Sequence, residues 1–154
     1  MKHRRSLLII ILIAFSPLLL SAQEKVPRKL YLGLDDGAGV NRQRSLIVKE
    51  YLALKIAEET TVVITEKEED ADCTLMIAVT ESDDGEALIT ARAVDILLEE
   101  EPFIYRKSLL RFSASALNST VLQEITREVE SAFPPMDQER SEEHTSELQS
   151  LLII

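Results

Sequence analysis

Histidine is missing from residues 23–139, which lie between two atypical chain ends; the two histidines of the 154-residue chain are His3 and His144. Without histidine this stretch has no Ser-His-Asp triad, no histidine general base and no histidine metal ligand. Tryptophan is absent from the whole chain, and Cys73 is the single cysteine. These absences remove the commonest hydrolytic and metal-dependent chemistries from residues 23–139.

Cys73 stands alone, so it cannot form an internal disulfide. With no histidine in residues 23–139, its thiol also lacks the usual activating base. Free cysteine is among the most buried residue types. We therefore expect Cys73 to be a small buried apolar residue, with an intermolecular disulfide as the alternative.

Basic residues are in the minority: the chain has 17 Lys and Arg against 27 Asp and Glu. Setting aside the 3 basic residues of 1–22, and the 1 basic and 3 acidic residues of 140–154, leaves 13 basic and 24 acidic residues, a net charge of −11. Such a charge repels nucleic-acid phosphates and anionic lipids. We expect no nucleic-acid partner.

Residues 1–22 have the pattern of a secretory signal peptide: a basic start, an apolar run at 7–20 and small residues that allow cleavage after Ala22. An uncleaved membrane anchor is the alternative, but an anchor needs about 20 apolar residues. The run here has 14 residues and contains Pro17. No cysteine follows it, so no lipid attachment is expected there. The pattern predicts a periplasmic or extracellular protein with no membrane span after cleavage.

The other end, residues 140–150 (RSEEHTSELQS), resembles a translated sequencing adapter, and residues 151–154 then read as its continuation. We interpret 140–154 as an adapter-derived artefact and set it aside before considering the fold. The alternative is a polar tail ending in four apolar residues. Residues 134–139 are then either a linker or the start of a missing region. If they start a missing region, the chain is the N-terminal fragment of a longer protein.

Residues 29–133, after a polar leader at 23–28, have the pattern of one α+β domain. Strand-like runs lie at 30–34, 60–65, 73–81, 87–96 and 103–112. The run at 73–81 is apolar on both faces, which favours a central strand. Asp84-Gly85 predicts a hairpin between the third and fourth runs, and residues 99–102 predict the next turn.

Two helices complete the domain. The first spans 42–59 after the N-cap Asn41 and has a broad apolar face. The second has apolar residues four apart, a capping box at Thr120 and Gln123, and a stop at Pro134-Pro135. The apolar faces are Ile47, Tyr51, Leu54, Val48, Leu52 and Ile56 in the first helix, and Leu117, Val121, Ile125, Val129, Leu122, Ala132 and Phe133 in the second.

The fold class expected is therefore α+β: a five-stranded mixed sheet with two helices packed on it. Counting every run gives the order β-α-β-β-β-β-α, and a conservative count gives β-α-β-β-β-α, which we adopt. We expect Ile77, Val79, Val121, Ile125 and Val129 to be buried.

Two segments carry a family resemblance: ADCTLMIAV at 71–79 and LITARAVD at 88–95. An Ala-Asp start to the central strand and a Thr-Ala-Arg-x-Val-Asp run in the next strand resemble the N-terminal domain of TolB and its relatives, including CsgG- and LpoB-type envelope assembly proteins. The resemblance covers about residues 29–133. It departs at Ile77, where the family often has glycine, and at 99–102, which replaces a glycine turn. It implies a five-stranded mixed sheet and a role in envelope protein interactions.

No residue set stands out as catalytic, cofactor-binding or metal-binding. Asp35 and Asp36 fit a turn better than a Ca²⁺ site, because Asp and Gly are ordinary turn residues. The acidic runs at 66–72 and 99–101 are typical of solvated loops, with a metal or a basic partner as the alternative. Arg92 and Asp95 lie three apart in a strand, hence on opposite faces, which disfavours a catalytic pair. Residues 118–120 match a glycosylation pattern but fit a helix cap.

Three functions remain open. The leading one is a non-enzymatic, exported envelope domain that binds or assembles other proteins, with no cofactor and an undefined oligomeric state. The second is an accessory domain of an enzyme whose catalytic part is missing, which the uninterrupted gene would reveal. The third is a carboxylate-based hydrolase or a Ca²⁺ site within residues 23–139.

Overall fold

The computed structural model describes residues 25–137, so the predicted signal peptide at 1–22 and the adapter-like segment at 140–154 lie outside the described residues. The main element is a mixed five-stranded sheet in the order β3-β2-β4-β5-β6. β2 is parallel to β3 and β4, and β4, β5 and β6 are antiparallel neighbours. The strands are β2 (Lys29–Leu34), β3 (Val63–Thr65), β4 (Cys73–Glu81), β5 (Ala87–Asp95) and β6 (Glu100–Leu109).

The expected α+β class and five-stranded mixed sheet are confirmed, and β4 is the central strand, as its two apolar faces predict. The adopted order β-α-β-β-β-α is wrong. The sheet and its main helices follow β-α-β-β-β-β-α, because the β-branched run near residue 63 forms a short real strand at the sheet edge. Of the run predicted at 60–65, residues 60 and 61 instead end the preceding helix and turn the chain.

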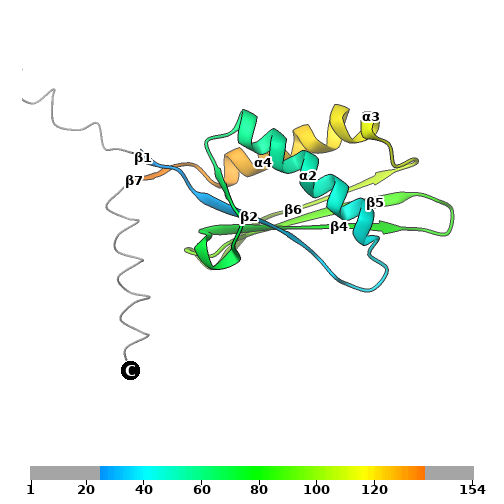
Figure 1. The fold of residues 1–154 in the computed structure, drawn as a ribbon, viewed down its shortest axis with the longest axis horizontal. Helices are drawn as coiled ribbons and strands as arrows, with labels where there is room; N and C mark the ends of the chain where they lie inside the picture. The colour runs from blue at the N-terminus through cyan, green and yellow to red at the C-terminus, as the bar shows by residue number, and fades with distance from the viewer. Residues whose placement is uncertain (1–24, 138–154) are drawn as a thin grey trace, which may run out of the picture.

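Helices cover one face of the sheet and leave the other without cover in the described part of the chain (Figure 1). Helix α2 (Arg42–Glu59) connects the parallel strands β2 and β3, which cannot be joined by a tight hairpin. Asn41 caps it as predicted, since its side chain accepts a hydrogen bond from the Arg44 backbone N–H. The start of α2 is fixed on the sheet by Ser45, which is buried and accepts a hydrogen bond from the Val79 N–H at 2.9 Å.

The apolar face expected for α2 is only half right. Val48, Leu52 and Ile56 are fully buried against the sheet. Tyr51 and Leu54 remain 42% and 64% exposed. A single sheet below the helix can cover only about one side of it, so a broad apolar stripe leaves its outer part in solvent.

The final helical run begins earlier than predicted. It consists of α3 (Ala114–Ala116), the π-helical turn η3 (Leu117–Val121) and α4 (Leu122–Ala132). The cap is Ser113, whose hydroxyl accepts the Ala116 N–H, so the predicted capping box at Thr120 and Gln123 is wrong: Thr120 lies inside the run. The helix ends before Pro134, as predicted.

The π-helical turn explains how residues four apart stay on one side. On an α-helix a spacing of four drifts by roughly 40° per step, because a turn holds 3.6 residues. A π-helical turn, hydrogen-bonded between residues i and i+5, holds more residues than an α-helical turn and offsets this drift. Leu117 and Val121 therefore lie on the same side of the helical run as Ile125 and Val129. The five residues expected to be buried (Ile77, Val79, Val121, Ile125 and Val129) all have zero exposure, which confirms that prediction.

Two turns show how well local sequence signals worked. The hairpin between β4 and β5 is where Asp84-Gly85 predicts it, with Gly85 at φ 81°. The next turn lies at residues 96–99, ahead of the predicted 99–102, and β6 starts at Glu100 rather than at 103. Glu99 adopts φ 54°, an uncommon value outside glycine, and so ends the turn before the proline.

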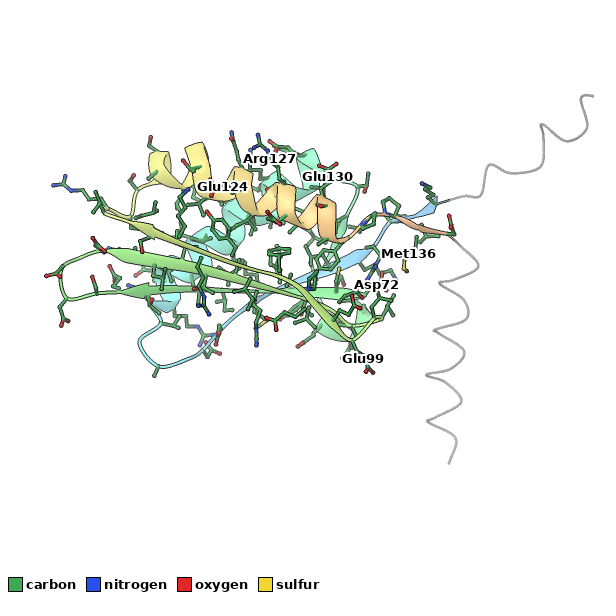
Figure 2. All side chains as sticks on the ribbon, turned by 180° about the vertical axis from the view of Figure 1, so that it is seen from behind. Asp72, Glu99, Glu124, Arg127, Glu130 and Met136 are labelled. Carbon is green, nitrogen blue, oxygen red and sulfur yellow. The ribbon has the colours of Figure 1, made fainter. Side chains whose placement is uncertain are left out.

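The two ends of the described chain meet in a small antiparallel ladder. Strand β1 (Lys25–Val26) pairs with β7 (Met136–Asp137). Both strands lie at the end of the sheet where β5 turns into β6 (Figures 1 and 2). This ladder places the segment around Arg28 beside the residues that follow α4.

Candidate functional site

The face of the sheet opposite the helices is not covered by any helix of residues 25–137 (Figure 1). We call it the bare face. Side chains alternate along each strand, and the pairing register fixes which residues share this face. The bare face comprises Lys29, Tyr31, Gly33, Val63, Thr65, Thr74, Met76, Ala78, Thr80, Leu88, Thr90, Arg92, Val94, Ile104, Arg106 and Ser108.

The charge of the bare face is opposite to that of the protein. Among the residues named above, Lys29, Arg92 and Arg106 are basic and none is acidic; Glu100 and Glu101 of β6 lie beyond the register shift and are not counted in this face. Acidic residues gather instead at the two ends of the sheet, at 66–72, at 81–86 and at 99–101, where Glu100 and Glu101 begin β6. In a stretch with a net charge of −11, a basic face of this kind attracts acidic surfaces.

Aliphatic side chains are interleaved with these cations. Val63, Leu88 and Ile104 are 49%, 38% and 49% exposed. Arg92 and Ile104 are directly paired across β5 and β6, with Met76 on the other side of Arg92. A surface that combines exposed aliphatic groups, threonines and arginines has the composition of a protein-binding surface.

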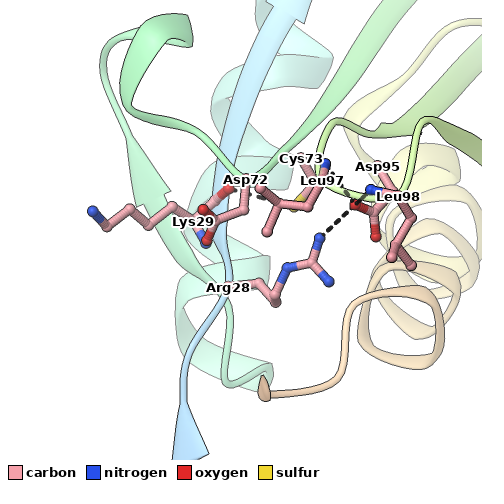
Figure 3. Close-up of polar contacts among 7 residues, drawn as sticks. All are labelled: Arg28, Lys29, Asp72, Cys73, Asp95, Leu97 and Leu98. Atoms are coloured by element: carbon pink, nitrogen blue, oxygen red, sulfur yellow. Dashed lines mark hydrogen bonds and ion pairs between the residues drawn. The ribbon is translucent and has the colours of Figure 1, made fainter. Parts of the chain in front are cut away.

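A second candidate lies at the end of the sheet, where a pocket of about 250 Å³ is formed. Arg28 and Asp95 line its inner side; both are 3% exposed, and their ion pair joins Arg28 Nη2 to Asp95 Oδ1 at 2.7 Å. The same Oδ1 accepts the backbone N–H groups of Leu97 and Leu98 (Figure 3). Asp95 therefore both neutralises a buried arginine and shapes the turn into β6.

Asp72, of the Ala-Asp motif, also binds the segment that contains Arg28. Its carboxylate accepts the Lys29 N–H at 2.8 Å, its own N–H donates to the Lys29 carbonyl, and its carbonyl accepts the Ile96 N–H. Cys73 is opposite Asp95 in the register. The aspartates of both quoted motifs thus meet around residues 28–29, and each has a structural role there (Figure 3).

Cys73 is buried at this junction, as predicted, with zero exposure. Its thiol donates to the Lys29 carbonyl at 3.4 Å. Burial raises the pKa of the thiol to about 12, so it stays protonated and unreactive near neutral pH. A thiol in this position cannot reach another chain, which argues against the intermolecular disulfide.

A third polar cluster fixes α4 to β6 on the covered face. Tyr105 Oη donates to Glu124 Oε2 at 2.6 Å, and Lys107 Nζ donates to Glu124 Oε1 at 2.9 Å. These two hydrogen bonds lower the pKa of the Glu124 carboxyl. The pKa of Tyr105 is raised, first by burial and then by the hydrogen bond to Glu124. Figure 2 places Glu124, Arg127 and Glu130 along α4.

The structure separates the candidates considered from the sequence. Arg92 and Asp95 lie on opposite faces of β5, as their spacing predicts: Arg92 is exposed and Asp95 is buried. Asp35 Oδ1 accepts the Gly37 N–H at 3.1 Å, which is the turn expected there. Within residues 25–137 no three acidic, histidine or cysteine side chains gather as a metal site would need. Residues 118–120 lie within the helical run.

Sequence reasoning missed Arg28. It lies in the segment taken as a polar leader at 23–28, and a lone arginine beside a proline gives no local sign of burial. Its burial depends on Asp95, which is 67 residues away, and on the Phe133 ring, 5.8 Å from the guanidinium carbon. A cation expected in solvent and an aspartate expected at a strand end gave no signal that the two would pair.

Comparison with known proteins gives structural likenesses only. No protein-family model and no curated protein sequence matches the chain. Two crystal structures of the PelC dodecamer from Paraburkholderia phytofirmans match with TM-scores of 0.47 and 0.45 and identities of 12% and 16%; each covers 71% of this chain, and 94% and 93% of the PelC chain. An uncharacterised lipoprotein from Nitrosomonas europaea matches with a TM-score of 0.34 and 17% identity, over 72% of this chain and 80% of its own.

A lipoprotein from Neisseria meningitidis gives a TM-score of 0.39 and 15% identity, over 67% of this chain and 94% of its own.

None of the helices between residues 25 and 137 is long and apolar enough to span a bilayer.

Proposed function

We propose that this chain is an exported, non-enzymatic domain of the bacterial cell envelope that binds another protein through its bare face. The observation that carries the proposal is the charge of that face: its defining residues, up to the register shift near Asp95, include three basic residues and no acidic one, in a strongly acidic stretch of chain. The resemblance to TolB-type domains and the signal-peptide pattern support the envelope location.

The basic side chains of the bare face are better explained by binding to a partner than by a role in stabilising the fold. Arg92 and Arg106 form no ion pair within residues 25–137, and Lys29 makes none there either. An exposed, unpaired arginine adds little to stability, whereas at an interface arginine gives charge-assisted and bidentate contacts to carboxylates. The partner that fits is therefore a protein surface with carboxylates and aliphatic side chains.

The test places a photoactivated crosslinking residue at Ile104, which lies on the bare face beside Arg92, in cells that export the full chain. We expect one defined protein adduct from position 104. The matched control is the same residue at Leu54, which is 64% exposed on the outer side of α2 and separated from the bare face by the sheet.

The two positions separate the outcomes. An adduct that forms from 104 and not from 54 supports the proposal once its mass identifies a partner with an acidic binding surface. A dimer of this chain as the main adduct, crosslinking to lipid alone, or equal yields from both positions would each contradict it.

A further inference from the structure

We infer that the pocket beside Arg28 and Asp95 is a second binding site, and that it takes a backbone amide of an extended peptide segment with an aliphatic side chain. This site is distinct from the bare face: it opens at the end of the sheet, between the turn at 96–99 and the segment after α4. Four observations support it.

The first is that Arg28, which lines the pocket, has unused hydrogen-bonding capacity. Arg28 is 3% exposed, yet its guanidinium makes a single hydrogen bond, through Nη2, and its buried Nε has no partner within the described residues. Buried polar groups in native proteins are nearly always hydrogen-bonded, so an arginine held in this state is unusual. The ion pair with Asp95 is not the two-bond arrangement that arginine and carboxylate prefer.

The second is that an acceptor lies next to these donors. All three hydrogen bonds to the Asp95 carboxylate from the described residues reach Oδ1, so Oδ2 keeps its capacity (Figure 3). A ligand that offers both an acceptor and a donor can therefore satisfy both sides of the ion pair. A peptide amide carries this combination, with its carbonyl toward Arg28 and its N–H toward Asp95.

The third observation is the charge around the pocket, which argues against an anion. The pocket holds one cation, Arg28, and two carboxylates, Asp95 and Asp137. The acidic run at 99–101 follows directly on the turn that forms one wall. A free carboxylate would meet a net negative site, whereas a neutral amide would not.

The fourth is the lining and size of the pocket. Leu97, Leu98, Pro134 and Pro135 supply apolar walls. A volume of about 250 Å³ is below that of most drug-sized sites, which start near 300 Å³, and corresponds to roughly eight water volumes of about 30 Å³. It suits one residue of a peptide with its backbone. Glu99 at φ 54° shows that the neighbouring turn is held in a strained form, a feature found at binding sites.

The experiment is an NMR titration of the purified full chain with N-acetyl-leucine methylamide, which carries two amides and one aliphatic side chain. We expect saturable shifts at the Leu97 and Leu98 N–H groups and at the Arg28 Nε–H, with millimolar affinity. N-acetyl-leucine, which has a carboxylate in place of the second amide, should bind about tenfold more weakly or not at all.

The variant Leu98→Glu adds a carboxylate at the rim and leaves Arg28 and Asp95 in place; it should weaken binding at least about tenfold. Leu98 is 46% exposed, so the substitution is compatible with folding. Leu110→Glu is the matched control, because Leu110 is 81% exposed and follows the far end of β6. Non-saturable shifts, equal affinity for the carboxylate probe, or unchanged binding by Leu98→Glu would overturn the inference.

Discussion

Strand β5 contributes alternate residues to the two faces of the sheet, so the faces can be compared along it residue by residue. Toward the helices, Ala87, Ile89, Ala91 and Ala93 are fully buried, and Asp95 is 3% exposed. Toward the bare face, Leu88 and Arg92 are exposed, and Thr90 and Val94 are partly so. The difference shows that the covered face supplies the packing that stabilises the fold, whereas the cations of the bare face contribute little to it. The sequence of the bare face is therefore free to serve recognition.

The largest effect expected from this comparison is at the end of β5. Asp95→Ala leaves Arg28 charged, buried and without its counter-ion, and should lower the free energy of unfolding by about 3–5 kcal/mol. Arg92→Ala, three residues earlier on the bare face, should change it by no more than about 0.5 kcal/mol. Urea unfolding followed by circular dichroism measures both. Similar losses for the two variants would contradict the division between the faces.

The next effect uses two adjacent residues. Ile89→Ala removes a fully buried side chain and should cost about 2–5 kcal/mol, since it leaves a cavity between the sheet and the helices. Leu88→Ala, on the bare face at 38% exposure, should cost less than about 1 kcal/mol. Equal losses of stability for the two variants would indicate that Leu88 is also buried in solution. That result would contradict an uncovered bare face.

The smallest effect concerns the cluster that holds α4 on β6. Because the pKa of Glu124 is lowered in the fold, its ionised form stabilises the protein above the ordinary value of 4.5, and this contribution is lost as the pH falls through the folded pKa. Glu124→Gln should therefore reduce Tm at neutral pH, by at most about 5 °C for an exposed cluster, and flatten the decline of Tm below pH 4.5. Glu128→Gln, an exposed change in the same helix, is the control. An unchanged acid decline in Glu124→Gln would contradict this role.

Much of the fold could be read from local patterns. The bounds of β4 and α2, the Asn41 cap, the Asp84-Gly85 hairpin and the line from Leu117 to Val129 follow from alternation, helical spacing and turn chemistry. The errors occur where a local signal competes with a distant one. Residues 99–102 look like a turn, yet Asp95 binds the N–H groups of Leu97 and Leu98 and places the turn earlier.

The sites were less predictable than the fold. Each strand taken alone shows only alternation, so the run of basic and neutral side chains on the bare face becomes visible once the register places β2, β4, β5 and β6 side by side. The pocket depends on the pairing of Arg28 with Asp95, 67 residues apart, and on the ladder between β1 and β7. The periodicity of a single segment gives no indication of pairings between residues so far apart in the sequence.

The central claim is that the cations of the bare face recognise an acidic protein partner. Its most direct test is the yield of the adduct from the crosslinker at Ile104 in the exported chain, with and without the double substitution Arg92→Glu and Arg106→Glu. The account predicts at least a tenfold loss of that adduct, about 1.4 kcal/mol in binding, while the chain stays folded and exported. An unchanged yield from a folded, exported double variant would contradict the account.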